Sequence, residues 1–235
     1  MSEIESNLKK IRDKIRIAAE KSGRDEKEIT LVAVTKTYSP DIINEAIALG
    51  VTDIGENKVQ EIVEKYDSVK PVRWHLIGHL QTNKVKYIID KVYMIHSVDS
   101  VRLMEEIDRQ AKKHSVVMKI LIQVNISGEE TKFGISPDRI GEMLECAERL
   151  SNVKVCGLMT ILPKVDNCVS LRLHFVNIRR IYIDISKKKY NNISMKYLSM
   201  GMSGDFEEAI EEGSNMVRIG RAIFGERNYS DAAKA

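Results

Sequence analysis

A repeated alternation of short apolar runs with segments of helical spacing is the feature that most constrains this chain's fold. The first repeat has an almost continuously apolar run at residues 30–35 (TLVAVT), as expected for a strand buried on both faces of a parallel sheet. Ser39 and Pro40 then have the residue types of an N-cap and a first helical position, and Gly50 ends the expected helix. Strands that alternate with helices predict a parallel α/β sheet.

The same pattern recurs along the rest of the chain. Further apolar runs lie at residues 51–55, 72–78, 93–98, 119–125, 153–159, 196–201 and 215–220. The helices that follow them are expected to begin at Lys58, Thr82, Ser100, Pro137, within 167–187, at Asp205 and near 222. Eight such units in one chain favour a closed (β/α)8 TIM barrel. An open doubly wound sheet remains the alternative.

The barrel units are preceded by one extra helix at residues 1–23. Ser2 with Glu5 fits a capping box, and Gly23 suits the position just after a helix end. We find no linker or break in composition, so residues 1–235 are expected to form a single barrel domain with a loose tail at 228–235. The segment 163–195 is the least clear part of this prediction.

Composition excludes several classes of protein. With 37 basic and 34 acidic residues the net charge is +3, which gives no reason to expect a nucleic acid or membrane partner. No stretch approaches the roughly 20 apolar residues of a membrane span. The cysteines Cys146, Cys156 and Cys168 match neither a zinc motif nor a disulfide framework, which favours reduced thiols in the cytoplasm. His75 and His79 are expected in a strand entering a loop, so no metal site is predicted.

One lysine lies at the end of the expected barrel where the functional residues of this fold are found. Functional residues of this fold follow the carboxyl ends of the strands, and Lys36 comes directly after the apolar run 30–35. Burial without an anion lowers the pKa of a lysine, and a neutral amine can attack a carbonyl carbon. The alternative is that Lys36 is simply the first solvated residue after a strand. Barrel aldolases also use such lysines, so the residue alone does not identify the chemistry.

The last two units carry glycines at the expected helix starts. Ser203 and Gly204 precede the helix at Asp205, and Gly220 with Arg221 precedes the last one. Glycine lets the backbone approach a ligand, and loops after the seventh and eighth strands often bind phosphate in this fold. Ordinary turn and capping glycines are the alternative. A reactive lysine beside a phosphate site suggests pyridoxal 5′-phosphate (PLP) or a sugar-phosphate aldolase.

A set of motifs in one order resembles a known family. They lie at residues 31–39 (LVAVTKTYS), 54–61 (IGENKVQE), 74–84 (WHLIGHLQTNK), 96–100 (HSVDS), 121–135 (LIQVNISGEETKFGI), 157–161 (GLMTI) and 198–227 (LSMGMSGDFEEAIEEGSNMVRIGRAIFGER). In this order they resemble the PLP homeostasis protein family (YggS/PROSC-like), with 163–195 least typical. The resemblance implies a barrel of PLP fold type III, like the N-terminal domain of alanine racemase.

The resemblance also implies roles for particular residues. It implies PLP bound as a Schiff base (an aldimine) on Lys36, with Asn57 close to the cofactor and Arg218 facing its pyridine nitrogen. It implies phosphate contacts from Ser203 and from around Gly220 and Arg221. We therefore expect Ser203, Gly204, Gly220 and Arg221 to form the phosphate site. The family more often has Thr or Ser at the position of Arg221, which puts the hydroxyl contact to phosphate in question.

Three functions are compatible with these residues. The first is a protein that holds PLP for vitamin B6 and amino-acid homeostasis without a dedicated reaction, and passes it to PLP-dependent apo-enzymes. The second is a weak PLP-dependent amino-acid racemase, and the third is a barrel aldolase. A two-base racemase of this type needs a further β-domain, and only eight residues follow Arg227. We therefore expect a monomeric cofactor-holding protein, not an enzyme.

Overall fold

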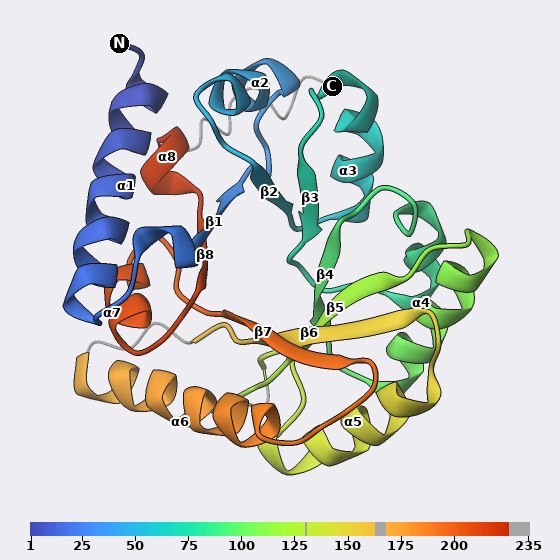
Figure 1. Ribbon diagram of the computed structural model, residues 1–235. Coiled ribbons are helices and arrows are strands. Elements are labelled where there is room, and N and C mark those ends of the chain that lie inside the picture. Colours follow the sequence, from blue (N-terminus) through green and yellow to red (C-terminus); the bar gives the residue numbers. More distant parts are fainter. Residues whose placement is uncertain (130, 163–167, 226–235) are drawn as a thin grey trace.

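Eight parallel strands close into one barrel, and their order around it is the order of the sequence (Figure 1). The computed structural model describes residues 1–129, 131–162 and 168–225. Strand β1 pairs with β2 on one side and with β8 on the other, so the closed barrel is confirmed and the open sheet is wrong. The strands are β1 (Thr30–Val34), β2 (Asp53–Glu56), β3 (Arg73–Leu76), β4 (Met94–Val98), β5 (Met118–Gln123), β6 (Val153–Met159), β7 (Ile193–Ser199) and β8 (Met216–Ile219).

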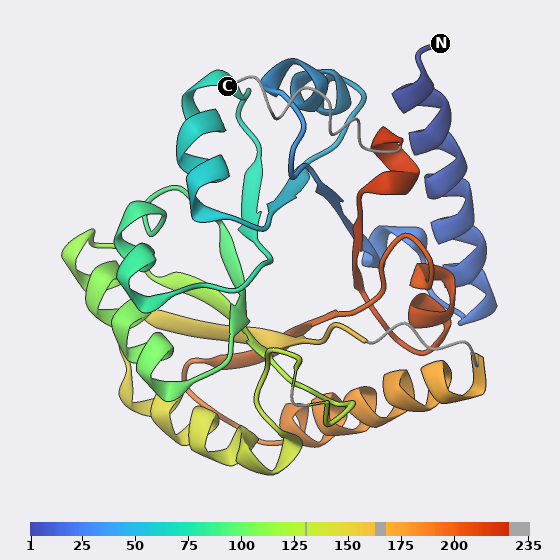
Figure 2. The same cartoon turned by 180° about the vertical axis from the view of Figure 1, so that it is seen from behind.

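Helices surround the barrel on the outside, as the view from behind also shows (Figure 2). They are α1 (Glu3–Lys21), α2 (Pro40–Ala48), α3 (Val59–Lys65), α4 (Val101–Lys113), α5 (Ile140–Arg149), α6 (Cys168–Ser186), α7 (Phe206–Glu211) and α8 (Arg221–Phe224). The helix predicted within 167–187 is confirmed by α6. The predicted loose tail at 228–235 lies outside the described residues, as does 163–167 in the least clear segment. None of the described helices is long and apolar enough to cross a membrane.

The extra helix α1 covers the side of the barrel formed by α7 and α8 (Figure 1). Ser2 Oγ accepts the Glu5 N–H at 3.2 Å, and Gly23 has a positive φ of 71° just after the helix. Asn7 Nδ2 donates to the Ile223 carbonyl at 3.1 Å, which ties α1 to α8. The first helix of the chain therefore packs on the last unit of the barrel.

One predicted helix takes a different form. After β3 the chain forms a 3-10 helix, η3 (Thr82–Tyr87), where helical spacing predicted an α-helix from Thr82. Val85 and Ile88 are three residues apart and both fully buried. A turn of three residues places both side chains on the same side, against the core, which an α-helical turn does less well.

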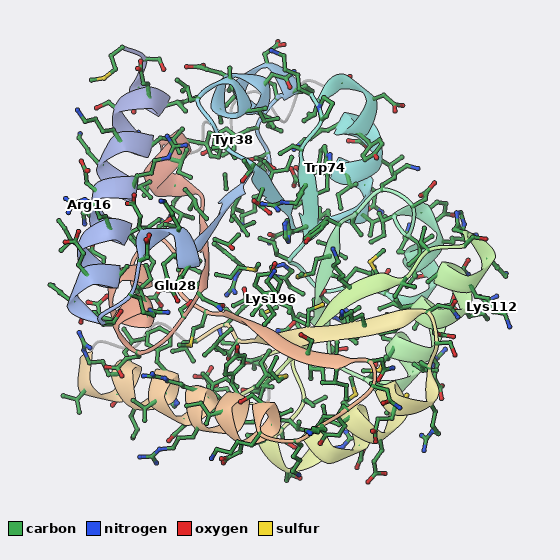
Figure 3. The ribbon with its side chains drawn as sticks, viewed as in Figure 1. Arg16, Glu28, Tyr38, Trp74, Lys112 and Lys196 are labelled. Atoms are coloured by element: carbon green, nitrogen blue, oxygen red, sulfur yellow. The ribbon has the colours of Figure 1, made fainter. Side chains whose placement is uncertain are left out.

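The barrel has an outer and an inner layer of buried side chains. Trp74 and Leu76 of β3 belong to the outer layer, and Figure 3 labels Trp74 at this strand. Inside the barrel lies a second apolar cluster of Val32, Met94, Leu121, Cys156, Met159 and Met216. His75, between Trp74 and Leu76, points inward because successive strand residues alternate between the two faces.

Candidate functional site

The loops after β1, β2, β7 and β8, with β8 itself, carry the residues predicted to form the site. The closed barrel makes these strands neighbours, with β1 between β2 and β8. Lys36 follows β1, and it is flanked by Asn57 after β2 and Gly220 after β8. The Gly220 N–H donates to Ser203 Oγ at 3.3 Å, which joins the loop after β7 to the end of β8. The structure thus brings these predicted residues to the carboxyl end of the barrel.

Two glycines allow the strand ends to come this close. A β-carbon on Gly220 would lie 3.2 Å from Val34 Cβ and from the Val34 carbonyl oxygen. A β-carbon on Gly78, after β3, would lie 2.3 Å from the Asn57 carbonyl oxygen. A side chain at Gly78 would therefore displace the backbone beside Asn57.

The backbone around Lys36 forms a tight and strained turn. Strand β1 ends at Val34, one residue before the predicted end, and Thr35 is fully buried. The Tyr38 N–H donates to the Thr35 carbonyl at 3.1 Å, so Lys36 and Thr37 form the bend. Thr37 has a φ of 70°, a left-handed conformation that β-branched residues rarely adopt. Lys36 is half-buried at this turn.

A network of charged side chains from strand β2 and helix α3, outside the barrel wall, holds that turn; we call it the outer network. Lys65 Nζ donates to Glu56 Oε1 at 2.9 Å, to Glu61 Oε2 at 2.8 Å and to the Thr35 carbonyl at 3.2 Å. Glu61 Oε2 accepts the Thr37 N–H at 2.7 Å, and Glu56 Oε1 accepts the Thr35 hydroxyl at 2.8 Å. The residues on both sides of Lys36 are therefore fixed by side chains of β2 and α3.

Burial and charge act in opposite directions on the two glutamates. Burial raises the pKa of Glu56 above its ordinary value, although Lys65 partly offsets this. Burial also favours a higher pKa for Glu61, but hydrogen bonds from Lys65 and from the Thr37 N–H outweigh it, so this pKa is lowered. Glu61 is therefore the firmly ionised partner that holds the Thr37 N–H.

Arg218 lies inside the barrel. Its Nη1 donates to the Ser199 carbonyl at 2.9 Å and to Ser199 Oγ at 2.6 Å, and its Nη2 donates to the Thr160 carbonyl at 2.8 Å. Burial lowers the pKa of Arg218 to about 10, with Asp205 acting in the opposite direction, so the guanidinium stays charged at neutral pH. The alternative of an outward-pointing Arg218 paired with Glu211 or Glu212 is wrong, because Arg218 is buried and its guanidinium donates to Ser199 and Thr160.

The predicted phosphate loops are open to solvent. Gly204 is exposed, and a β-carbon there would meet no atom within 4 Å. Arg221 is also exposed. Gly201 is the glycine that the backbone requires, since it has a φ of 94° and its β-carbon would lie 2.6 Å from Ala209 Cβ. The loops thus leave room for an anion beside Ser203.

Comparison with known proteins identifies the family. Residues 6–228 match the model of the alanine racemase N-terminal domain. The chain is 44% identical to the pyridoxal phosphate homeostasis protein of Aquifex aeolicus over 224 residues, which cover 94% of this chain and 97% of that protein. The chain belongs to the pyridoxal phosphate homeostasis protein family. A second member, from Escherichia coli K12, is 38% identical over 98% of this chain and 99% of its own.

Two solved structures of a similar protein have the same fold. PipY of Synechococcus elongatus without PLP is 30% identical, with a TM-score of 0.85, over 94% of this chain and all of its own. PipY with PLP bound is 29% identical, with a TM-score of 0.81 and the same coverage. PipY, a protein similar to this chain over 94% of its length, has therefore been solved with PLP bound.

The sequence analysis missed the residues that support the predicted ones. Glu61 and Lys65 have the i,i+4 spacing of a helical ion pair, which could have been recognised. His75, His96 and Ser199 lie on three different strands, β3, β4 and β7, and nothing in the sequence indicates that they meet. Among the described residues no group of three or more His, Cys, Asp or Glu could hold a metal ion.

Proposed function

We propose that this chain holds PLP covalently on the Lys36 amine for intracellular vitamin B6 and amino-acid homeostasis, without a dedicated reaction. The observation that carries the proposal is that Lys36 follows strand β1, whose last residue Val34 lies against Gly220, and that the Gly220 N–H donates to Ser203 Oγ. Membership of a PLP homeostasis family and a PLP-bound relative support it. We further propose that it acts as a cytoplasmic monomer and passes PLP to apo-enzymes.

The residues present fit the chemical groups of PLP. PLP supplies an aldehyde that an amine can trap and a ring that can withdraw electrons. Lys36 offers the amine, at a turn fixed on both sides by the outer network. Open space at Gly204, the Ser203 hydroxyl and the exposed Arg221 suit a phosphate, and Asn57 lies after the neighbouring strand. The residues expected at the site therefore offer an amine for the aldehyde of PLP, and a hydroxyl and a cation for its phosphate.

Borohydride labelling tests the attachment to Lys36. The purified protein with PLP should be yellow, and reduction should fix a phosphopyridoxyl group on the peptide that contains Lys36. Lys36→Ala should lose the visible band, while Lys58→Ala, which removes an exposed lysine after the next strand, should keep it. A label on any other peptide would show that the attachment site is wrong.

The phosphate site has its own test. We propose that Ser203, Gly204, Gly220 and Arg221 hold the phosphate, with Arg221 adding a charge-assisted contact if its side chain turns inward. Ser203→Ala should weaken PLP more than it weakens pyridoxal, which lacks the phosphate. Equal losses for both ligands would argue against a phosphate role. An unchanged PLP affinity in Arg221→Ala would limit that residue to its backbone N–H.

Arg218 explains why the bound cofactor should be inert. A PLP ring withdraws electrons best when its pyridine nitrogen is protonated. Arg218 is charged and offers only donors, so beside that nitrogen it would disfavour a second positive charge. Arg218→Glu should let the nitrogen take up a proton near neutral pH, and the ¹⁵N resonance of labelled PLP should shift. The same resonance in both proteins would remove Arg218 from this role.

Weak racemase activity is the alternative function. We expect no appreciable racemase, transaminase or decarboxylase turnover. Amino acids incubated with the PLP-loaded protein in deuterated water should keep their α-hydrogen. Sustained exchange that Lys36→Ala abolishes would favour the racemase.

A further inference from the structure

A continuous chain of buried polar side chains crosses the interior of the barrel; we call it the inner relay. Arg218 Nη1 lies 2.6 Å from Ser199 Oγ, which lies 3.3 Å from His96 Nδ1. His96 Nε2 lies 2.9 Å from His75 Nδ1, and His75 Nε2 lies 2.9 Å from Asp53 Oδ1. All five side chains are buried. The relay therefore connects a carboxylate to the guanidinium without an intervening apolar side chain.

The relay runs between the two ends of the barrel. Asp53 is the first residue of β2, where it also accepts from Arg73 Nη2 at 2.5 Å and from Thr52 Oγ1 at 2.7 Å. Ser199 is the last residue of β7 and lies next to Arg218. One end of the relay is thus at the amino ends of the strands, and the other is at the level of the proposed cofactor site.

The chemistry of the partners fixes the direction of every hydrogen bond. An ionised Asp53 can only accept, so His75 Nε2–H must donate to it. A neutral His75 then accepts at Nδ1, so His96 Nε2–H is the donor between the two rings. A neutral His96 in turn accepts at Nδ1, from the Ser199 hydroxyl, and Ser199 Oγ accepts from Arg218 Nη1. All donors therefore point from Arg218 toward Asp53.

The charge states that this assignment needs agree with the surroundings. Burial favours a higher pKa for Asp53, but hydrogen bonds from His75, Arg73 and Thr52 outweigh it and lower the pKa. Burial lowers the pKa of His75 despite Asp53, and the nearby cations Arg73 and Lys119 act in the same direction as burial.

The second histidine is neutral for similar reasons. Burial holds the pKa of His96 well below its ordinary value, and His75 and Arg218 lower it further. The relay is therefore a carboxylate and a guanidinium joined by two neutral rings and a hydroxyl.

We propose that Asp53, His75, His96 and Ser199 are positioning residues for Arg218, and that the direction of their hydrogen bonds fixes how Arg218 meets the cofactor ring. The inference rests on the proposed function, because it assumes that Arg218 faces PLP. Arg218 has no carboxylate in direct hydrogen-bond contact among the described residues, and its Nη1 is held by Ser199. Asp53 orients that hydroxyl through the two rings, although it lies on another strand at the opposite end of the barrel.

A space-filling role alone would not need these residues. Apolar side chains fill most of the barrel interior, and they bury no group that must find a hydrogen-bond partner. Two fully buried imidazoles and a serine are tolerated only because each is satisfied by the next. Because all hydrogen bonds of the relay point the same way, reversing one of them requires the others to reverse as well.

Asp53→Asn reverses that direction with almost no change in shape. The side-chain oxygen of the asparagine stays where Arg73 and Thr52 donate, so its NH₂ group faces His75 Nε2. His75 must then accept at Nε2 and carry its proton on Nδ1. His96 must follow and donate from Nδ1 to Ser199 Oγ, which already accepts from Arg218.

Nitrogen NMR of the protein without PLP detects this reversal. Wild type should show both histidines as neutral Nε2–H tautomers, assigned with His75→Gln and His96→Gln. Asp53→Asn should switch both to Nδ1–H, while Thr52→Val, which keeps the carboxylate, should switch neither. An unchanged His96 tautomer in folded Asp53→Asn, or an Nδ1–H form of His96 in wild type, would overturn the relay.

A second measurement connects the relay to the cofactor. Asp53→Asn and Ser199→Ala should each release PLP about three to ten times faster than wild type, about the effect of one lost hydrogen bond, and should shift the pyridine ¹⁵N resonance. Thr52→Val should release it at the wild-type rate. If both variants keep the wild-type rate and resonance, the link to Arg218 is wrong even where the tautomers switch. If wild type takes up no PLP, the proposed function fails, and the tautomers alone decide whether the relay exists.

Discussion

The outer network lies outside the barrel wall and the inner relay inside it, with only strand β2 contributing to both, and the two use different chemistry. The outer network joins Lys65 to two carboxylates and to backbone groups of residues 35–37 over single contacts of 2.7 to 3.2 Å. The inner relay joins one carboxylate to one guanidinium through two neutral rings and a hydroxyl. The first holds a strained piece of backbone, and the second sets the orientation of a side chain.

The difference shows what each kind of contact can do. Charges attract in all directions, so a lysine between two glutamates can hold a turn of unfavourable geometry in place. Neutral imidazoles attract weakly at a distance, but each has one donor and one acceptor, so they carry a direction from one end of the barrel to the other. Strong charge–charge contacts therefore hold the backbone beside Lys36, and directed hydrogen bonds orient the side chain of Arg218.

Removing the cation of the outer network should have the largest effect. In Lys65→Met the buried Glu56 loses its charged partner, and breaking such a pair costs about 3–5 kcal/mol of unfolding free energy. The loss should shrink as the pH falls, because the pKa of Glu56 is already raised by burial and the carboxyl then takes up a proton. Urea unfolding at two pH values measures both effects.

An exposed ion pair gives the matched control. Lys187 pairs with Asp184 at 2.9 Å with both side chains mostly exposed. Lys187→Met should change the unfolding free energy by less than about 1 kcal/mol. Equal losses in the two variants would mean that the outer network contributes no more than a surface pair.

The fold could be predicted from the sequence because its signals are local and repeated. Each strand–helix unit has its own apolar run and helix start, and eight such units in succession favour one arrangement, a closed parallel barrel. The 3-10 helix η3 could not be distinguished from an α-helix, because spacings of three and four residues overlap in so short a segment.

The pH dependence of the unfolding free energy should distinguish the inner relay from the outer network. The pKa of His75 and that of His96 are lowered in the folded protein, so the unfolded chain takes up protons first. Stability should therefore fall as the pH drops below about 6.5, by at most about 1.4 kcal/mol per pH unit for each histidine. Glu56 acts with the opposite sign, because its raised pKa lets the folded state take up a proton first, and that contribution is lost as the pH rises through it.

Single variants separate these contributions. His96→Gln should have a shallower decline of unfolding free energy between pH 6.5 and pH 5 than wild type, because one buried titrating group is gone. His114→Asn changes an exposed histidine at the end of α4 and should keep the wild-type slope. If His96→Gln keeps that slope as well, His96 does not supply the acid sensitivity.

The site could be predicted only in part, for a physical reason. Lys36 and the glycine loops follow strand ends, so their place in the chain indicates their place in the barrel. Glu56, His75 and His96 lie within strands, and their partners depend on strand register and on which face each side chain occupies. Register is set by the closed barrel as a whole, and no local pattern reports it.

The smallest effect on stability is expected at Thr37, next to Lys36. Thr37→Gly relieves a left-handed conformation that costs a non-glycine residue about 1–2 kcal/mol, but glycine also loses more freedom on folding. The two effects oppose each other, so the unfolding free energy should stay within about 1 kcal/mol of wild type. The bound cofactor should nevertheless exchange faster, because the turn that carries Lys36 is no longer restricted by a β-branched side chain.

Ser115 offers a control with the same backbone conformation and no connection to the site. It has a φ of 56° in the exposed turn after α4, so Ser115→Gly makes the same kind of change far along the chain from Lys36. Both variants should have similar unfolding free energies, and only Thr37→Gly should speed PLP exchange, followed as the loss of isotope-labelled PLP from the protein into an excess of unlabelled PLP. Equal exchange rates in the two variants would mean that the outer network fixes the turn by itself. Faster exchange in Thr37→Gly alone would mean that the strained residue shares in holding Lys36, beside the charge contacts from Glu61 and Lys65.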